Sequence, residues 1–407
     1  MGRAPARLLL AAALCLLGAG ASLADGLDIA VGKAVFDRPW VPAPSSTRGN
    51  DGLGPLFDAR SCSACHPKDG RGTARIGADG APLGHGLVVA LARPGGAPDP
   101  IYGARLQTEA VQGLDAEAIV RIREAKDSAG RTTRAPVLSA RAYGPLAPDT
   151  VPRLRVAPDL RGRGLLERVP RAAILALEDP QDRDGDGVRG RAHRLVGADG
   201  RETLGRFGWK AAQPNLAGQI TEAFHLDLGL STPLLPEPWG DCTPAQMLCR
   251  NAPHGATQEG ESEISPALFT ALVAYVADLP VPDARADAAG ARLFAATGCA
   301  ACHRPSLPLE GGGTAALFTD VLLHDLGPGL DDGLDTPAAA GREWRTAPLA
   351  GISQALARGT GLLHDGRAGD VKAALAWHGG EAASALARYG KLPARDRDAL
   401  IRYVSGL

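Results

Sequence analysis

The chain has 407 residues and a formal net charge of −1, and 45% of its residues are hydrophobic. This length is enough for two or three domains, and the near-neutral charge excludes the basic surface expected of a nucleic acid-binding protein. Aromatic residues make up only 4% of the chain, so we expect something other than aromatic side chains to fill part of the core.

The first 24 residues have the layout of a secretory signal peptide. Arg3 and Arg7 precede an apolar run from Leu8 to Leu17, and small residues follow up to Ala24. The run is too short to cross a bilayer of roughly 30 Å, so a membrane anchor is the less favoured alternative. We expect cleavage after Ala24, export to the periplasm and a mature chain that does not span the membrane.

The motif C-x-x-C-H occurs twice. It lies in "LFDARSCSACH" (56–66) and in "LFAATGCAACH" (293–303), and these two segments share seven of eleven residues. The residues of the two motifs are Cys62, Cys65, His66, Cys299, Cys302 and His303.

C-x-x-C-H is the attachment motif of c-type haem: the thiols form thioethers to the porphyrin and the histidine binds iron. The alternatives are a zinc ribbon and a redox-active dithiol. Zinc would need a closed set of four ligands, and a dithiol needs no histidine. The sequence therefore predicts two covalently bound haem c groups, with His66 and His303 as iron ligands. Buried haem would also explain the scarcity of aromatic residues.

A second internal repeat defines the domains. "ALVAYVADL" (271–279) and "ALIRYVSGL" (399–407) agree at five of nine positions, and both have the spacing of amphipathic helices. Each unit thus begins near a C-x-x-C-H motif and ends with a similar helix. We predict an N-terminal cytochrome c-like haem domain over residues 25–281, with large insertions, and a C-terminal one over residues 282–407.

The fold class expected from these patterns is mainly α, with long irregular loops. Residues 67–165 are rich in Gly, Pro and Arg and are expected to form loops with short elements. Helices are predicted over residues 115–126, 170–178, 215–225, 265–279, 286–297, 370–378 and 395–405.

An acidic segment, "DRDGDG", places Asp182, Asp184 and Asp186 at alternate positions before Gly187. Calcium loops have this spacing, but the twelfth position holds His193 rather than Glu, so the motif is not a complete EF-hand. The segment predicts a structural calcium site, with an ordinary acidic turn as the alternative.

Cys242 and Cys249 are the remaining cysteines of the exported chain. They are close in sequence and follow two prolines and a tryptophan. In an oxidising compartment a local disulfide is the favoured interpretation, ahead of a redox-active pair.

The sixth iron ligand decides whether a haem transfers electrons or binds a small molecule. Met247 is the only methionine after Met1, so at most one haem can be His/Met. In "GDVKAALAWHGG", His378 shares a helix face with Val371 and Leu375, which favours His378 as the second ligand of the C-terminal haem. His364 in "LLHDGRA" is the main alternative.

The corresponding segment of the N-terminal unit differs at this point. Aligning "FGWKA" with "LHDGRA" pairs Trp209 with His364 and places Ala223 opposite His378. The N-terminal haem is therefore expected to lack the ligand that the C-terminal haem has.

Polar residues lie close to this missing ligand. Gln219, Glu222 and Asp227 could hold water or peroxide and move protons. The alternative is that the two carboxylates are ordinary charges on a helix surface.

Together these motifs resemble the di-haem oxidoreductases related to bacterial di-haem cytochrome c peroxidases and to the enzyme that matures methylamine dehydrogenase. The resemblance is to the branch once called thiol oxidoreductases, and it covers nearly all of the mature chain. It rests on "CSACH", "VAPDLRGRGLLERVP", "DRDGDGVRGR", "GRFGWKAAQPNLAGQITEAF", "CAACHRP", "FTDVLLHDLGPGL", "EWRTAPLAG", "LLHDGRA" and "WHGGEA".

The resemblance implies a division of labour between the haems. In the relatives the N-terminal haem meets peroxide, and the C-terminal haem takes electrons from a donor protein. The sixth ligand of the latter lies fourteen residues after the histidine of an H-D-G motif, which is His378 counted from His364. The relatives have Met or Tyr there, so a histidine implies a lower potential than a His/Met haem has.

The resemblance also implies roles at the N-terminal haem. A tryptophan between the haems, followed ten residues later by a glutamine, matches Trp209 and Gln219. The glutamate expected ten residues further on is replaced by Gly229, which leaves Glu222 and Asp227 as candidates for the distal acid. The relatives often hold calcium near the haem–haem junction.

The function expected from the sequence is that of a periplasmic di-haem peroxidase, which reduces hydrogen peroxide with electrons from a small soluble cytochrome c or cupredoxin. Two alternatives remain open: an electron-transfer cytochrome without substrate chemistry, in which both irons are six-coordinate, and an oxidase that uses high-valent iron on a protein or organic substrate. The sequence leaves open whether a resting sixth ligand such as His85 leaves the N-terminal haem on activation.

Overall fold

The computed structural model describes residues 26–407 apart from residues 48, 198, 257–260 and 337–338. The predicted signal peptide therefore lies outside the described residues. Across the described part of the chain, no helix is long and apolar enough to cross a membrane.

The helices are short and lie mainly at the two ends of the described chain and around residues 216–278. Besides a helix over residues 26–37, they are α2 (Cys62–Cys65), α3 (Arg171–Leu175), α4 (Leu216–Ala223), α5 (Met247–Arg250), α6 (Pro266–Asp278), α7 (Ala288–Ala296), α8 (Ile352–Ala357), α9 (Val371–Leu375), α10 (Ala383–Lys391) and α11 (Ala394–Ser405). Six of the seven predicted helices are confirmed, as α3, α4, α6, α7, α9 and α11.

The strands form several small antiparallel sheets. They are β1 (Leu56–Phe57), β2 (Leu87–Ala92), β3 (Arg105–Leu106), β4 (Glu109–Ala110), β5 (Ile119–Lys126), β6 (Thr132–Ser139), β7 (Val151–Val156), β8 (Arg194–Val196), β9 (Glu202–Leu204), β10 (Leu307–Pro308), β11 (Thr314–Ala315), β12 (Leu323–Asp325) and β13 (Glu343–Arg345). The prediction of a mainly α protein is wrong, because only 30% of the chain is helical while 17% lies in strands.

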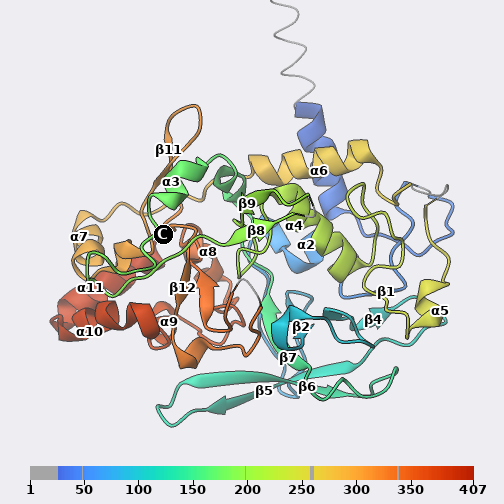
Figure 1. Ribbon diagram of the computed structural model, residues 1–407, viewed down its shortest axis with the longest axis horizontal. Helices are drawn as coiled ribbons and strands as arrows, with labels where there is room; N and C mark the ends of the chain where they lie inside the picture. Colours follow the sequence, from blue (N-terminus) through green and yellow to red (C-terminus); the bar gives the residue numbers. More distant parts are fainter. Residues whose placement is uncertain (1–25, 48, 198, 257–260, 337–338) are drawn as a thin grey trace, which may run out of the picture.

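The seventh predicted helix, residues 115–126, is instead strand β5. Val120 and Ile122 are buried on one side of this strand. Along the chain they alternate with Arg121 and Arg123, which face the other side. This period of two fits a strand, and β6 pairs with β5 along its whole length. The hairpin lies along the lower edge of Figure 1, beneath the sheet β3-β2-β7.

The largest hydrophobic core joins the two predicted units. It contains Phe36, Leu216 and Leu272 from the N-terminal side, together with Leu317 and Leu322 from beyond residue 281. A second core lies wholly within residues 294–407, where α7, α9 and α11 pack together. Cys299 of the C-terminal C-x-x-C-H motif packs against this second core, whose helices α7, α9 and α11 are labelled in Figure 1.

Candidate active site

The two C-x-x-C-H motifs fold in the same way. Cys62–Cys65 forms α2, and the amide of His66 donates to the carbonyl of Cys62 at 2.9 Å. Cys299–Ala301 forms a 3₁₀ turn, and the amide of His303 donates to the carbonyl of Cys299 at 3.0 Å. In both cases one turn of helix brings the two thiols and the histidine together.

His66, His303 and His378 each have one ring nitrogen fixed by a backbone carbonyl, as do His85 and His193. The Nδ1 atoms of His66, His303 and His378 lie 3.2, 3.1 and 2.9 Å from the carbonyl oxygens of Gly70, Phe318 and Ala374. A proton on Nδ1 leaves the lone pair on Nε2, which is the tautomer of a histidine that binds a metal through Nε2. Burial lowers the pKa of His66, His303 and His378, which keeps them neutral, as iron binding requires.

The four thiols of the motifs are not activated as nucleophiles. Burial raises the pKa of Cys62 to about 12, and it also raises the pKa values of Cys65, Cys299 and Cys302. A redox-active dithiol needs a lowered thiol pKa, so the structure disfavours that alternative.

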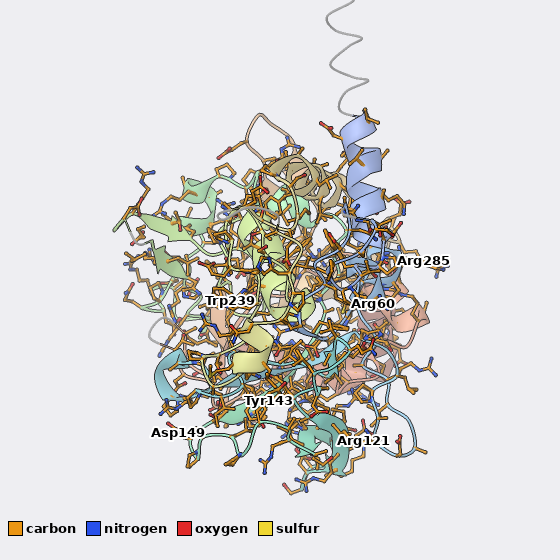
Figure 2. The ribbon with its side chains drawn as sticks, turned by 90° about the vertical axis from the view of Figure 1, so that its right-hand side faces the viewer. Arg60, Arg121, Tyr143, Asp149, Trp239 and Arg285 are labelled. Atoms are coloured by element: carbon orange, nitrogen blue, oxygen red, sulfur yellow. A yellow bond between two sulfur atoms is a disulfide. The ribbon has the colours of Figure 1, made fainter. Side chains whose placement is uncertain are left out.

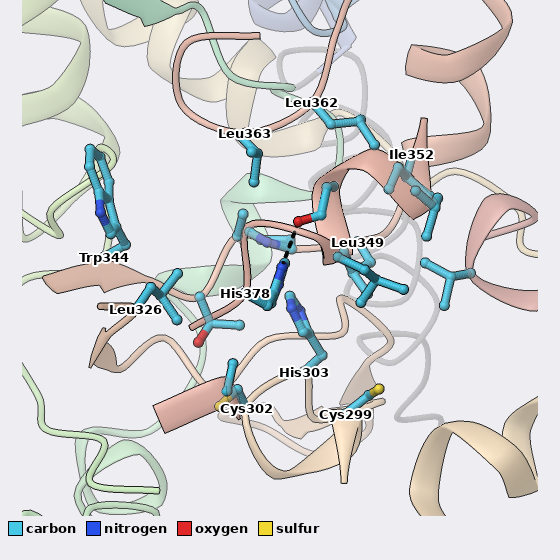
Figure 3. A pocket seen from close by; sticks show the side chains of 18 of the residues that line it. Cys299, Cys302, His303, Leu326, Trp344, Leu349, Ile352, Leu362, Leu363 and His378 are labelled. Atoms are coloured by element: carbon cyan, nitrogen blue, oxygen red, sulfur yellow. Dashed lines mark hydrogen bonds between the residues drawn. The ribbon is translucent and has the colours of Figure 1, made fainter. Parts of the chain in front are cut away.

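The C-terminal motif opens into an apolar cavity of about 240 Å³. Figure 3 shows His303 and His378 next to each other in this cavity, with Cys299 and Cys302 beside them. Burial, together with the neighbouring His378, lowers the pKa of His303 to about 4. Most of the lining is aliphatic or aromatic, including Phe294, Leu349, Ile352, Leu362, Leu363, Val371, Leu375, Leu386, Leu400 and Val404. Such a cavity, with thiols and neutral imidazoles at its wall, fits a covalently attached porphyrin.

His364 lies in the same cavity but in a different environment. Its ring stacks on Trp344, with centroids 3.9 Å apart, and meets Trp209 edge-on at 6.4 Å. His324 is also excluded as a ligand, because Asp320 and Glu381 lie 2.8 and 2.7 Å from its two ring nitrogens. Of the histidines near His303, His378 is thus the one whose ring is fixed through Nδ1 alone.

The N-terminal motif lies beside a buried polar cluster, which includes Gln219, Glu222 and Asp227. Gln219 Nε2 donates to Glu222 Oε2 at 3.2 Å, and Arg105 forms an ion pair with Asp227. The charge of Asp227 acts on both Cys62 and Cys65, so the cluster is close to the turn formed by the N-terminal C-x-x-C-H motif. The structure therefore brings the three predicted residues together at this site.

Several polar atoms of this cluster have no partner. Gln219 Oε1 and Asp58 Oδ2 are buried acceptors, and Arg105 Nε is a buried donor, without a hydrogen-bond partner among the described residues. Burial raises the pKa of Asp58 to about 7 and also raises the pKa values of Glu222 and Asp227. A region with unpaired donors and acceptors and carboxyls of raised pKa can hold a small polar ligand and exchange protons with it.

Sequence reasoning missed Arg105 and Asp58. Arg105 is in β3 and Asp58 directly follows β1, and neither belongs to a motif. The pairing of β1 with β4 and of β3 with β2 brings both residues to the turn of the N-terminal C-x-x-C-H motif. No local signal distinguishes Arg105 among the 44 lysines and arginines of the chain.

Trp209 lies between the two sites. It lines the C-terminal cavity, and its indole donates to the carbonyl of Val156 at 3.0 Å. The preceding residue, Gly208, is so close to the N-terminal cluster that an added Cβ would lie 3.3 Å from Gln219 Oε1. The segment 208–219 thus connects the cavity with the polar cluster.

Three carboxylates of the acidic loop lie close together. Oxygen atoms of Asp182, Asp184 and Asp186 lie within 4.8 Å of one another. The loop reaches the C-terminal cavity through Arg189, whose amide donates to Glu381 at 2.7 Å.

Cys242 and Cys249 form a disulfide. Both are buried next to Leu56, and Trp239 and Tyr143 pack against them. Figure 2 shows Trp239 and Tyr143 on the face of the molecule that is turned toward the viewer. The disulfide closes a loop that supplies Gln246, a hydrogen-bond donor to the fully buried Glu117.

Two C-x-x-C-H turns with neutral histidines define a protein with sites for two haem groups. A family model described as "Di-haem oxidoreductase, putative peroxidase" matches residues 18–84 and 117–407. The chain therefore belongs to the di-haem oxidoreductase family. Arg105 and His85 lie in residues 85–116, which the family model does not match.

Other comparisons add little. No curated protein matches the chain. A chain of hydrazine synthase from Kuenenia stuttgartiensis, studied under 20 bar of xenon, is similar at 15% identity over 92% of both chains, with a TM-score of 0.37. A score this low carries no argument about fold or function.

Proposed function

We propose that the chain is a periplasmic di-haem c-type oxidoreductase that reduces hydrogen peroxide with electrons from a small soluble redox protein. The observation that carries the proposal is the difference between the two sites. His303 has a second neutral histidine, His378, beside it, whereas the N-terminal turn has a cluster of acids, an amide and an arginine. One site is suited to passing electrons and the other to binding a small polar substrate.

Haem c, when bound, would supply an iron atom that exchanges electrons with the substrate. The protein side chains would then position peroxide and move its protons. The free Oε1 of Gln219 can accept a hydrogen bond from peroxide, while its Nε2 holds the Glu222 carboxylate. Desolvation raises the pKa of Glu222, which favours its taking a proton from peroxide and returning it to the departing oxygen.

Asp227 and Arg105 would set the charge around this step. The guanidinium of Arg105 opposes the effect of burial on the pKa values of Asp227 and Glu222. Four carboxyls, those of Asp58, Glu222, Asp227 and Asp241, act on this one arginine. Arg105 thus keeps part of the cluster ionised and able to accept protons.

Electrons would enter through the C-terminal site and pass by way of Trp209. The donor is expected to be a small soluble protein of the cytochrome c or cupredoxin type. Trp209 and His364 form an edge-on contact, and Trp209 adjoins the segment that carries Gln219. An aromatic side chain at this position shortens the distance that an electron must cross between the two sites.

The first test is haem content. A pyridine haemochrome assay on the purified, denatured and washed protein should find two covalent haems per chain. Cys62→Ala with Cys65→Ala, and separately Cys299→Ala with Cys302→Ala, should each leave one. A parent protein with one haem or none would refute the proposal, and Cys242→Ala with Cys249→Ala should keep both haems.

An electron-transfer cytochrome is the second candidate, and His85 is the observation that favours it. The Nδ1 of His85 lies 2.8 Å from the carbonyl of Asp58, and the carbonyl of His85 accepts a hydrogen bond from Cys65. His85 is therefore next to the N-terminal turn with Nε2 available for iron. If the parent protein binds no cyanide in any redox state and His85→Ala does bind it, the chain is an electron carrier.

We also propose that Asp182, Asp184 and Asp186 bind calcium. Since the loop is hydrogen-bonded to Glu381, calcium should stabilise the C-terminal site. Adding calcium to chelator-treated protein should raise the unfolding temperature, and Asp184→Asn should abolish that rise. An equal rise in parent and variant would show that calcium acts elsewhere.

A further inference from the structure

Three buried arginines belong to the lining of the C-terminal cavity. Arg71, Arg163 and Arg345 line it together with His303 and His378. Each arginine is more than nine-tenths buried. Arg163 acts on the pKa values of both Arg71 and Arg345, so these cations are grouped in a cavity whose lining is otherwise mainly apolar.

The hydrogen bonds of Arg163 and Arg345 leave them without an anion. Arg163 Nε donates to the carbonyl of Asp159 at 3.0 Å, and its Nη1 donates a hydrogen bond to none of the described residues. Arg345 donates to the carbonyls of Gly208 and Thr346, at 2.8 and 3.2 Å. Backbone carbonyls satisfy part of each guanidinium but do not neutralise its charge.

The carboxylates whose charges act on these two arginines already have other partners. Asp320, which acts on Arg345, is paired with His324, and Asp159 acts on Arg163. Both oxygens of Asp159 are engaged by the guanidinium of Arg161. Burial lowers the pKa of Arg163 to about 10, and burial together with the charge of Arg163 lowers that of Arg345 to about 9. Two like charges buried side by side are costly unless an anion lies between or beside them.

We propose that Arg163 and Arg345 bind the propionate carboxylates of the haem at the C-terminal site. Haem has an apolar ring and two anionic side chains, and the cavity has the matching division into aliphatic and cationic parts. Guanidinium and carboxylate groups pair through two parallel hydrogen bonds, which suits a rigid cofactor edge. The inference rests on the proposed function only in that haem is bound at this site.

The position of the two arginines gives the pairing a further role. Arg345 donates to the carbonyl of Gly208, the residue before Trp209, and Arg163 begins a 3₁₀ turn that packs against α6. Propionates held here would place the cofactor edge next to Trp209. The same contacts would therefore fix the haem and raise its midpoint potential, since nearby cations favour the reduced iron.

The test is the midpoint potential of each haem in Arg163→Gln, Arg345→Gln and the double variant. Spectroelectrochemical titration should show a lower potential for the C-terminal haem in each single variant and a larger fall in the double variant. Redox-induced infrared difference spectra should show altered carboxylate bands. Above all, the potential should become more dependent on pH, because a propionate without its arginine has a higher pKa.

Matched variants separate pairing from other effects of the substitutions. Arg304→Gln removes an exposed arginine next to His303 and should leave the potential almost unchanged. Arg163→Lys and Arg345→Lys keep the charge, so the potential of the C-terminal haem should stay near that of the parent. These lysine variants keep the inference testable if a glutamine variant fails to fold.

Three results would overturn the inference. One is a fall in the potential of the C-terminal haem no larger than that caused by Arg304→Gln. Another is an equal fall in this potential in the lysine and glutamine variants. The third is a change confined to the N-terminal haem. A parent protein without haem would instead refute the proposed function, so the two failures can be told apart.

Discussion

Replacing His378 with alanine should convert one low-spin haem signal to a high-spin one in electron paramagnetic resonance of the oxidised protein. His378 lies beside His303, and its Nδ1 is tied to the carbonyl of Ala374, so Nε2 is free for iron. Removing the imidazole leaves His303 as the only protein ligand of that haem. A five-coordinate or water-bound iron is high-spin, so the expected change is complete for one haem of the two.

Two further variants make this test specific. His378→Met supplies another axial ligand and should keep the haem low-spin while raising its potential. His364→Ala should leave the spin state unchanged, because its ring is stacked on Trp344. If His364→Ala gives the high-spin signal and His378→Ala does not, the assignment of the ligand is wrong.

The parts of the site that could be predicted from the sequence are local. A C-x-x-C-H motif needs only one helical turn, and Ser61 caps the first such turn by accepting from the amide of Ala64. The start of α9 likewise follows from Asp370, whose side chain caps it by accepting from the amide of Ala373. The helix ends at Leu375, three residues before His378. Short-range hydrogen bonds decide these features, and their residues are close in sequence.

The parts that could not be predicted depend on contacts between distant segments. Arg105 reaches Asp227 across 122 positions of the sequence, through strands whose pairing no local pattern specifies. The segment 115–126 contains good helix formers, but the apolar side chains of Val120 and Ile122 fit the sheet and are buried there. Tertiary burial decided the conformation of β5 against its helix propensity.

The polar cluster illustrates the same limit for function. Gln219 and Glu222 could be found because they follow Trp209 within one short segment. Asp58 could not, since its significance comes from complete burial beside Cys65, which raises its pKa to about 7. Burial is a property of the folded chain, and so is every shifted pKa in the cluster.

Replacing Glu222 with glutamine should slow peroxide reduction roughly 100- to 10,000-fold, the usual effect of losing a general acid–base catalyst. Glutamine keeps the shape and can still bond to Gln213 and Gln219, both of which donate to Glu222 Oε2, but it cannot exchange a proton. Haem content and both midpoint potentials should therefore stay close to those of the parent. The rate is measured with peroxide and a reduced small donor protein.

Cyanide binding shows whether the loss lies in the chemistry or in access to iron. The half-reduced parent should bind cyanide at one haem only, the one that lacks a counterpart of His378, and Glu222→Gln should still bind it. Glu237→Gln changes a partly buried glutamate that acts on His225 and not on the polar cluster, so it should keep the parental rate. If Glu222→Gln also keeps that rate, Glu222 is not the distal acid, and Asp227 becomes the residue to test. If the parent consumes no peroxide and neither haem takes cyanide, the second candidate function, an electron carrier, replaces the enzyme.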